Sequence, residues 1–339
     1  MNIMIKSTGN HFTKNTIIGI KKIMMKKLQI YLIVFILLPF FGCVKTLNED
    51  LKAKETKLVL NSLMNPDSSL KINLSRTFNV FDDESSNNLP FVNQAKVSLF
   101  ENNNYLFDLI SEGNGYYSKP DFFPLPFTQY KVKASADTYK TIEAQVQIPN
   151  KVQIISFDTS SLIHNDEYDG MYTQNIGKIS YKDPTEESNY YQLTCQILAP
   201  FGPDGEKKWQ KHGIYVEENN DILFDNSYGS LLWNDKYTNG RHVEFRFGYY
   251  DVYTYMERKQ TLVEDTLQFV FSLQSVDKDY YIYLKTISLY EETSGGSDPF
   301  MEPVVIHSNV ENGYGILGGF QQDTVSSSLI INREDGGVK

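Results

Sequence analysis

Shortages of cysteine, histidine and long apolar runs exclude several classes of protein at the outset. Only two cysteines occur in 339 residues, so the fold is not a disulfide framework. The histidines beyond residue 42 are isolated, no HExxH pattern or cysteine pair accompanies them, and we expect no metal site. No GxSxG motif and no recognisable pair of carboxylates is present. We therefore expect no enzyme activity and no cofactor.

The one long apolar run, Leu28–Phe41, is too short for a membrane span, which needs about 20 residues. Four lysines at positions 21, 22, 26 and 27 come shortly before it and the small Gly42 follows it, which is typical of a secretory signal. The ending Leu-Pro-Phe-Phe-Gly-Cys resembles a bacterial lipobox, with Phe40 where leucine is usual. We predict cleavage of residues 1–42 and lipid attachment to Cys43. An ordinary signal peptide is the alternative, and translation begins at Met1, Met24 or Met25.

The chain after residue 42 has little positive charge. It carries 26 basic and 42 acidic residues, a net charge of −16. Such a surface repels phosphate backbones, and no basic run with interleaved aromatic residues compensates for it. We expect no nucleic-acid partner. The sequence up to this point implies one partner, a membrane, to which the lipid on Cys43 would anchor the chain.

Alternating apolar and polar residues predict many short, half-buried strands. Residues 43–57 are polar and form a flexible tether, whereas helical signals are weak and residues 280–291 fit either period. Turns are expected at 102–104, 113–115 and 120–126. Cys195 falls on the apolar face of its strand and is expected to be inert. The clearest alternating segments are 70–78, 95–99, 130–136, 142–148, 190–198, 243–249 and 267–273.

The predicted fold is all-β, with 44 tyrosine and phenylalanine residues to fill the core. We expect a β-sandwich domain over residues 58–150 and a second β-rich domain over residues 151–339.

The glycine-rich stretch 313–319 contains a literal GxGxxG, but no helix or βαβ unit is expected around it. We predict that the block 309–320 is a structural or docking loop at the surface, linking a strand at 304–306 to another at 329–331, with Gly315 and Gly318 as candidate docking residues. The calcium-like stretch 165–170 lacks the closing glutamate and is predicted to be a solvated acidic loop.

An aromatic segment at residues 249–256 is the best candidate for ligand contact. Aromatic rings stack on sugars and fill peptide pockets, and they also fill cores and strand edges. Both interpretations stay open, the core being the commoner use. The candidate ligand residues are Trp209, Trp233, Tyr249 and Tyr250.

Several blocks together resemble a known family. They include KLVLNSLMNPDSSLKINLSRT, VNQAKVSLFE, GYYSKPDF, KDPTEESNYYQL, LQSVDKDYYIYL and DPFMEPVVIHSNVENGYGILGGF. In this order they resemble the domain-of-unknown-function 4249 family of Bacteroidetes outer-membrane lipoproteins. The first domain also looks like an immunoglobulin-like or carboxypeptidase-regulatory-like sandwich.

The resemblance implies no established activity and no catalytic residues. It implies a non-catalytic accessory of a TonB-dependent outer-membrane transporter, anchored at the outer membrane on its periplasmic or surface-exposed face. A structural or adhesive cell-surface protein is the second hypothesis, and a hydrolase without a recognisable site is the third. The ligand is not identified by the sequence.

Overall fold

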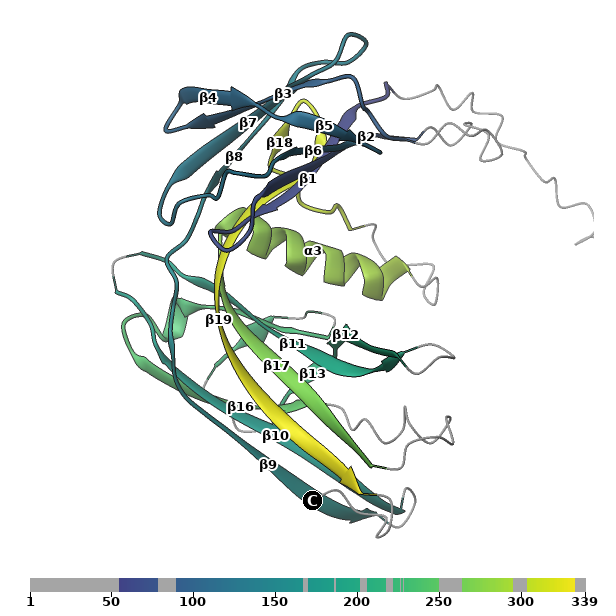
Figure 1. The fold of residues 1–339 in the computed structure, drawn as a ribbon. Helices are drawn as coiled ribbons and strands as arrows, with labels where there is room; N and C mark the ends of the chain where they lie inside the picture. The colour runs from purple at the N-terminus through teal and green to yellow at the C-terminus, as the bar shows by residue number, and fades with distance from the viewer. Residues whose placement is uncertain are drawn as a thin grey trace, which may run out of the picture. The chain divides into compact units, whose positions relative to one another are not determined.

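The computed structural model describes residues 55–78, 90–166, 170–185, 187–201, 206–217, 222–225, 227, 229–249, 264–294 and 304–332, all within one compact unit. Strands dominate these residues, so the all-β prediction is confirmed (Figure 1). The elements in chain order are β1 (Leu58–Met64), β2 (Leu70–Arg76), β3 (Lys96–Glu101), β4 (Asn104–Asp108), β5 (Ile110–Gly113), β6 (Tyr116–Lys119), β7 (Gln129–Ser135), β8 (Ile142–Gln147), β9 (Ile154–Asp166), β10 (Gly170–Lys182), β11 (Tyr190–Phe201), β12 (Glu206–His212), β13 (Ile214–Val216), β14 (Phe224–Asp225), β15 (Leu231–Asn234), the 3-10 helix η2 (Asp235–Tyr237), β16 (His242–Tyr249), β17 (Glu264–Val276), the α-helix α3 (Lys278–Ser294), β18 (Val310–Glu311) and β19 (Tyr314–Asn332).

The first part of the chain forms a sandwich of two sheets. One sheet places β1, β2, β6 and β5 side by side, and the other runs β18-β8-β7-β3-β4. Alternation directs Leu60 and Ile72 from the first sheet, and Val132 from the second, into a shared buried core. Burying each such side chain contributes about 1.5–3 kcal/mol. The strands predicted at 70–78, 95–99, 130–136 and 142–148 are confirmed as β2, β3, β7 and β8.

The tight turns of this sandwich use asparagine and glycine in the left-handed region. Asn102 and Asn103 lie between β3 and β4. Gly113 ends β5, and Asn114 and Gly115 follow it before β6; all five residues have positive φ. These two residue types enter that region at the lowest steric cost. The turns predicted at 102–104 and 113–115 are confirmed.

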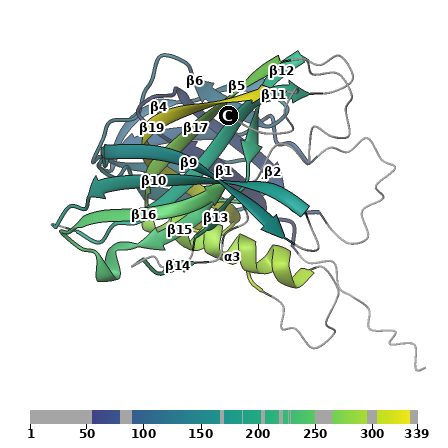
Figure 2. The same cartoon turned by 90° about the horizontal axis from the view of Figure 1, so that it is seen from below.

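A second pair of sheets encloses an aromatic core. β11, β17, β15, β14 and the C-terminal part of β19 form one sheet, and β13-β16-β10-β9 form the other. Figure 2 shows β9, β10 and β16 crossing in front of β11, β17 and β19. Tyr191, Trp233, Phe247 and Phe271 fill the space between the two sheets. Cys195 is fully buried on β11, as predicted, and burial raises the pKa of its thiol.

Strand β19 belongs to both pairs of sheets. Its residues 314–319 pair in parallel with β1, and residues 320–332 pair antiparallel with β17 (Figure 1). Just before it, β18 pairs with β8. The sandwich therefore includes the chain's last described strands as well as its first. The predicted boundary near residue 150 does not assign β18 and residues 314–319 to the sandwich with which they pair.

Two predictions about the glycine-rich stretch are wrong. Residues 313–319 form no loop between two strands, because β19 already begins at Tyr314, and residues 304–306 form no strand. The glycines are accommodated inside a strand because β1 and helix α3 approach it too closely for side chains. Residues 280–291, for which the sequence left strand and helix open, lie within the helix α3.

Candidate functional site

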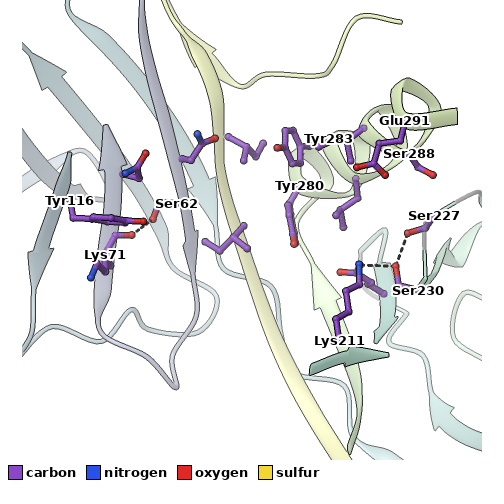
Figure 3. A pocket seen from close by; sticks show the side chains of 17 residues that line it. Ser62, Lys71, Tyr116, Lys211, Ser227, Ser230, Tyr280, Tyr283, Ser288 and Glu291 are labelled. Carbon is purple, nitrogen blue, oxygen red and sulfur yellow. Dashed lines mark hydrogen bonds between the residues drawn. The ribbon is translucent and has the colours of Figure 1, made fainter. Parts of the chain in front are cut away.

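An open cleft of about 640 Å³ lies among β1, β2, β6, α3 and the β11–β12–β15 region (Figure 3). Its size falls within the range of about 300–1,000 Å³ that is typical of small-molecule sites. The lining residues share a mixed character of aromatic rings, amides, hydroxyls and aliphatic side chains. They are Asn61, Ser62, Leu63, Lys71, Asn73, Tyr116, Gln192, Lys211, Ser227, Ser230, Tyr280, Tyr283, Leu284, Ile287, Ser288, Glu291 and Ile316.

The first wall of the cleft is the outer face of the sandwich. Strand alternation that sends Leu60 and Ile72 into the core turns Asn61, Lys71 and Asn73 outward, and Tyr116 joins them from β6. Figure 3 shows Lys71 beside the Tyr116 ring, and the ammonium lies 4.6 Å from the ring centroid.

The charge of Lys71 is largely offset within the protein. Its Nζ lies 3.1 Å from Oε2 of Glu112, and Ser118 also donates a hydrogen bond to the Glu112 carboxylate. These donors hold the pKa of Glu112 below its usual value. The pair is exposed and contributes little stability.

Helix α3 forms the second wall. Six residues at helical spacing, from Tyr280 to Glu291, line the cleft, and Figure 3 shows Tyr280, Tyr283, Ser288 and Glu291 on this helix. The rings of Tyr280 and Tyr283 stack with centroids 6.4 Å apart. Burial raises the pKa of Tyr280 to about 12, so its hydroxyl stays protonated at neutral pH.

Other side chains of α3 are fixed by hydrogen bonds. Lys285 Nζ lies 2.6 Å from Asp225 Oδ1, and Tyr281 donates to the other oxygen of the same carboxylate. Near the N-terminus, His307 Nε2 lies 2.8 Å from Asp279 Oδ1. The helix is thus held to β14 and to the 304–309 segment.

Asp277 joins the start of α3 to the glycine-rich part of β19. Its Oδ1 accepts from the backbone N–H groups of Asp279 and Tyr280 at 2.9 and 3.2 Å, which caps the helix. Its Oδ2 accepts from the Gly319 N–H at 2.5 Å. Two of the blocks that carry the family resemblance, DKDYYIYL and GYGILGGF, therefore meet at one carboxylate.

This carboxylate is expected to make stability depend on pH. Burial raises its pKa to about 6, although the three N–H donors oppose the shift. Between pH 4 and 6 the unfolded chain has lost this proton and the folded chain retains it, so stability falls as pH rises. The expected loss is about 2–3 kcal/mol.

Asp277→Asn should remove that slope, besides lowering stability overall, because an amide cannot accept hydrogen bonds on both sides. Urea unfolding of both proteins from pH 4 to 7 measures the difference, and other titrating groups cancel between them. Parallel stability curves for the two proteins would show that Asp277 does not titrate in this range.

The third wall comes from β11, β12 and β15 with their connections. Ser227 and Ser230 lie 2.6 Å apart through their hydroxyl oxygens, and Gln192 Nε2 donates to Ser230 Oγ at 3.0 Å (Figure 3). A second pocket of about 690 Å³ shares these two serines and Lys211. The two hollows therefore adjoin at Lys211, Ser227 and Ser230.

The structure places the aromatic candidates away from this cleft. Trp233 and Tyr249 are buried in the second core, so the prediction that they contact ligand is wrong. Trp209 is exposed on β12 but does not line the cleft. Tyr250 and Cys43 lie outside the described residues, and so does part of the acidic stretch 165–170.

The other candidates and the cleft residues missed by the sequence prediction lie close together. Gly315 and Gly318 are in β19, where a side chain on Gly318 would meet Tyr280. Tyr116, Tyr280 and Tyr283 line the cleft and were not predicted. The one sequence feature that could have indicated them is that they lie in the GYYSKPDF and DKDYYIYL blocks. The strand pairing that brings these two blocks together joins residues far apart in sequence.

Neither a metal centre nor a membrane helix occurs among the described residues. No group of three or more histidine, cysteine, aspartate or glutamate side chains there is placed to hold a metal ion. No helix in this part of the chain is long and apolar enough to span a bilayer.

Fold and site together define a β-rich protein of two linked sheet pairs with an open, mixed cleft beside one helix. The chain belongs to the family defined by the domain of unknown function DUF4249, whose model matches residues 44–326. A solved structure titled "Biofilm associated protein - BSP domain" is similar at 10% identity and a TM-score of 0.23, over 80% of this chain and 58% of that chain. No curated protein matches the chain.

Proposed function

We propose that the mature chain is a lipid-anchored, non-catalytic accessory of a TonB-dependent outer-membrane transporter. It binds the transporter, the transported substrate, or both. The observation that carries the binding role is the open cleft, which combines ring faces with hydrogen-bonding groups as ligand sites commonly do. The lipobox at Cys43 supports the anchor.

The hydroxyl groups of the cleft support binding rather than chemistry. Ser227 and Ser230 contact each other, and Ser230 also accepts from the amide of Gln192. A nucleophilic serine needs an adjacent base, and an amide does not remove its proton. Ser62 donates to the backbone carbonyl of Lys71 at 2.8 Å, which occupies its proton in the fold.

Affinity purification from native membranes tests this function. The wild-type protein should remain in the membrane fraction and co-purify with a transporter of the outer membrane. Cys43→Ser, which removes the lipid acceptor, should appear in the soluble exported fraction with little transporter attached. The substitution falls in the predicted tether 43–57, so thermal melting of the variant should match that of the wild type, which shows that its fold is intact.

Two results would contradict the proposal in different ways. Membrane retention of Cys43→Ser that only detergent reverses would disprove lipid anchoring at this residue. A wild-type preparation free of any transporter, after mild crosslinking, would disprove the accessory role.

A further inference from the structure

The polar part of the cleft is mostly uncharged. It presents the amides of Asn61, Asn73 and Gln192 and the hydroxyls of several serines and tyrosines. Lys71 is paired with Glu112 at 3.1 Å. Lys211 and Glu291, the other charged residues of the lining, also interact within the protein. The charges at the cleft, Lys71 and Lys211 against Glu112 and Glu291, therefore sum to zero, and the lining favours no ligand of one charge.

The apolar part of the cleft consists of ring faces and short aliphatic surfaces. Tyr116 is 41% exposed on the sandwich wall, and Tyr283 is half-buried on the helix wall. Leu63, Leu284 and Ile287 lie in the same lining. A ligand that satisfies both parts needs apolar faces and many hydrogen-bonding edges. Sugar rings combine C–H faces with hydroxyl edges in this way.

The sandwich wall does not favour an extended peptide. Peptides commonly bind by adding a strand to a free sheet edge. β1 lies between β19 and β2, β2 lies between β1 and β6, and β6 lies between β2 and β5. Each of these strands already has a neighbouring strand on both sides, so this wall offers side chains and no free edge.

We infer that the cleft binds a neutral, hydroxyl-rich ligand of the oligosaccharide class, stacked on Tyr116 and hydrogen-bonded to the amides of Asn61 and Asn73. This inference rests on the proposed function and identifies the chemistry of its ligand. The ring of Tyr116 has the ammonium of Lys71 near it, which fixes the ring without changing the net charge of the wall.

A printed array of neutral glycans, followed by calorimetric titration of the best binder, tests the inference on the mature protein. Tyr116→Ala should weaken binding about tenfold, the upper end of what one aromatic contact contributes. Asn73→Ala should weaken it further when the two changes are combined. Affinity should hardly change between about 50 and 500 mM NaCl, because screening acts on charged ligands.

Tyr237→Ala is the matched control. Tyr237 is 56% exposed and has the ammonium of Lys236 5.2 Å from its ring centroid, but it does not line the cleft. This variant should bind glycan as the wild type does, and unchanged thermal melting of all variants shows that the fold is intact.

The inference is overturned if the wild type binds no neutral glycan, or if Tyr116→Ala binds as tightly as Tyr237→Ala. Binding of an acidic glycan that falls steeply with salt would also overturn it. So would Tyr116-dependent binding of an uncharged octapeptide in place of glycans. In each case, co-purification of a transporter with the wild type would still support the proposed function. The absence of a transporter would contradict both the proposed function and the inferred ligand.

Discussion

Replacing Gly315 by alanine should destabilise the mature domain by about 2–6 kcal/mol, enough to prevent folding of many domains. Gly315 has a φ of +108°, and a Cβ there would lie 2.0 Å from the carbonyl oxygen of Leu60. The contact is with the backbone of β1, which pairs with β19 at this position and cannot move aside independently. Both backbone strain and steric overlap therefore oppose any side chain.

Gly113→Ala is the matched control, because Gly113 has a φ of +86° and no atom within 4 Å of its Cβ position. This substitution carries the strain alone and should cost about 1–3 kcal/mol. Urea unfolding of both variants measures the difference. Equal losses of stability would contradict the close approach of β1 to β19.

Trp233→Ala should destabilise the protein by about 3–5 kcal/mol. The indole is fully buried, its ring stacks on Tyr191 with centroids 5.5 Å apart, and its Nε1 donates to Tyr181 Oη at 2.9 Å. Truncation leaves a large cavity and removes that hydrogen bond. Equilibrium unfolding measures the loss, and the tryptophan emission of the folded wild type reports the buried indole.

Trp209→Ala provides the comparison, since Trp209 is 48% exposed on β12. Its stability should stay within about 0.5 kcal/mol of the wild type, as is usual for surface positions. Wild-type stability for Trp233→Ala together with loss of ligand binding would reinstate the indole as a ligand contact. Such a result would exclude the core position assigned to it.

The strands were predictable because their signal is local. In β16 the residues Val243, Phe245 and Phe247 alternate with polar neighbours, and the alternate residues are the ones that the core buries. Turn chemistry was equally local, since Asn102 and Gly115 adopt the positive φ that their residue types favour.

The glycine-rich part of β19 and the helix α3 depend on contacts that are distant in sequence. The density of glycines predicts a loop. The reason that these glycines lie in a strand is the backbone of Leu60, which is packed directly against Gly315. Helix α3 buries Tyr281 on one side and lines the cleft with Tyr283 and Ile287 on another. Apolar residues occur around much of the helix, so the sequence does not show the 3.6-residue pattern of an amphipathic helix.

The candidate site was mispredicted for the same reason. Tryptophan is a common ligand contact and also a common core residue, and sequence alone does not separate the two uses of Trp233. The cleft combines Tyr116 with Tyr280 and Tyr283, which lie more than 150 residues apart in the chain. Only the return of β19 to pair with β1 brings those segments to one place.

We expect this cleft to be the functional surface, and hydrogen–deuterium exchange can locate the surface that binds. The complex purified from native membranes is compared with the free mature protein. We expect slower exchange in the complex for residues 280–291 of α3 and around Tyr116, with the β9 segment 154–163 unchanged as an internal reference. Unchanged exchange in both cleft segments, with protection confined to other parts of the chain, would show that the cleft is not the binding surface.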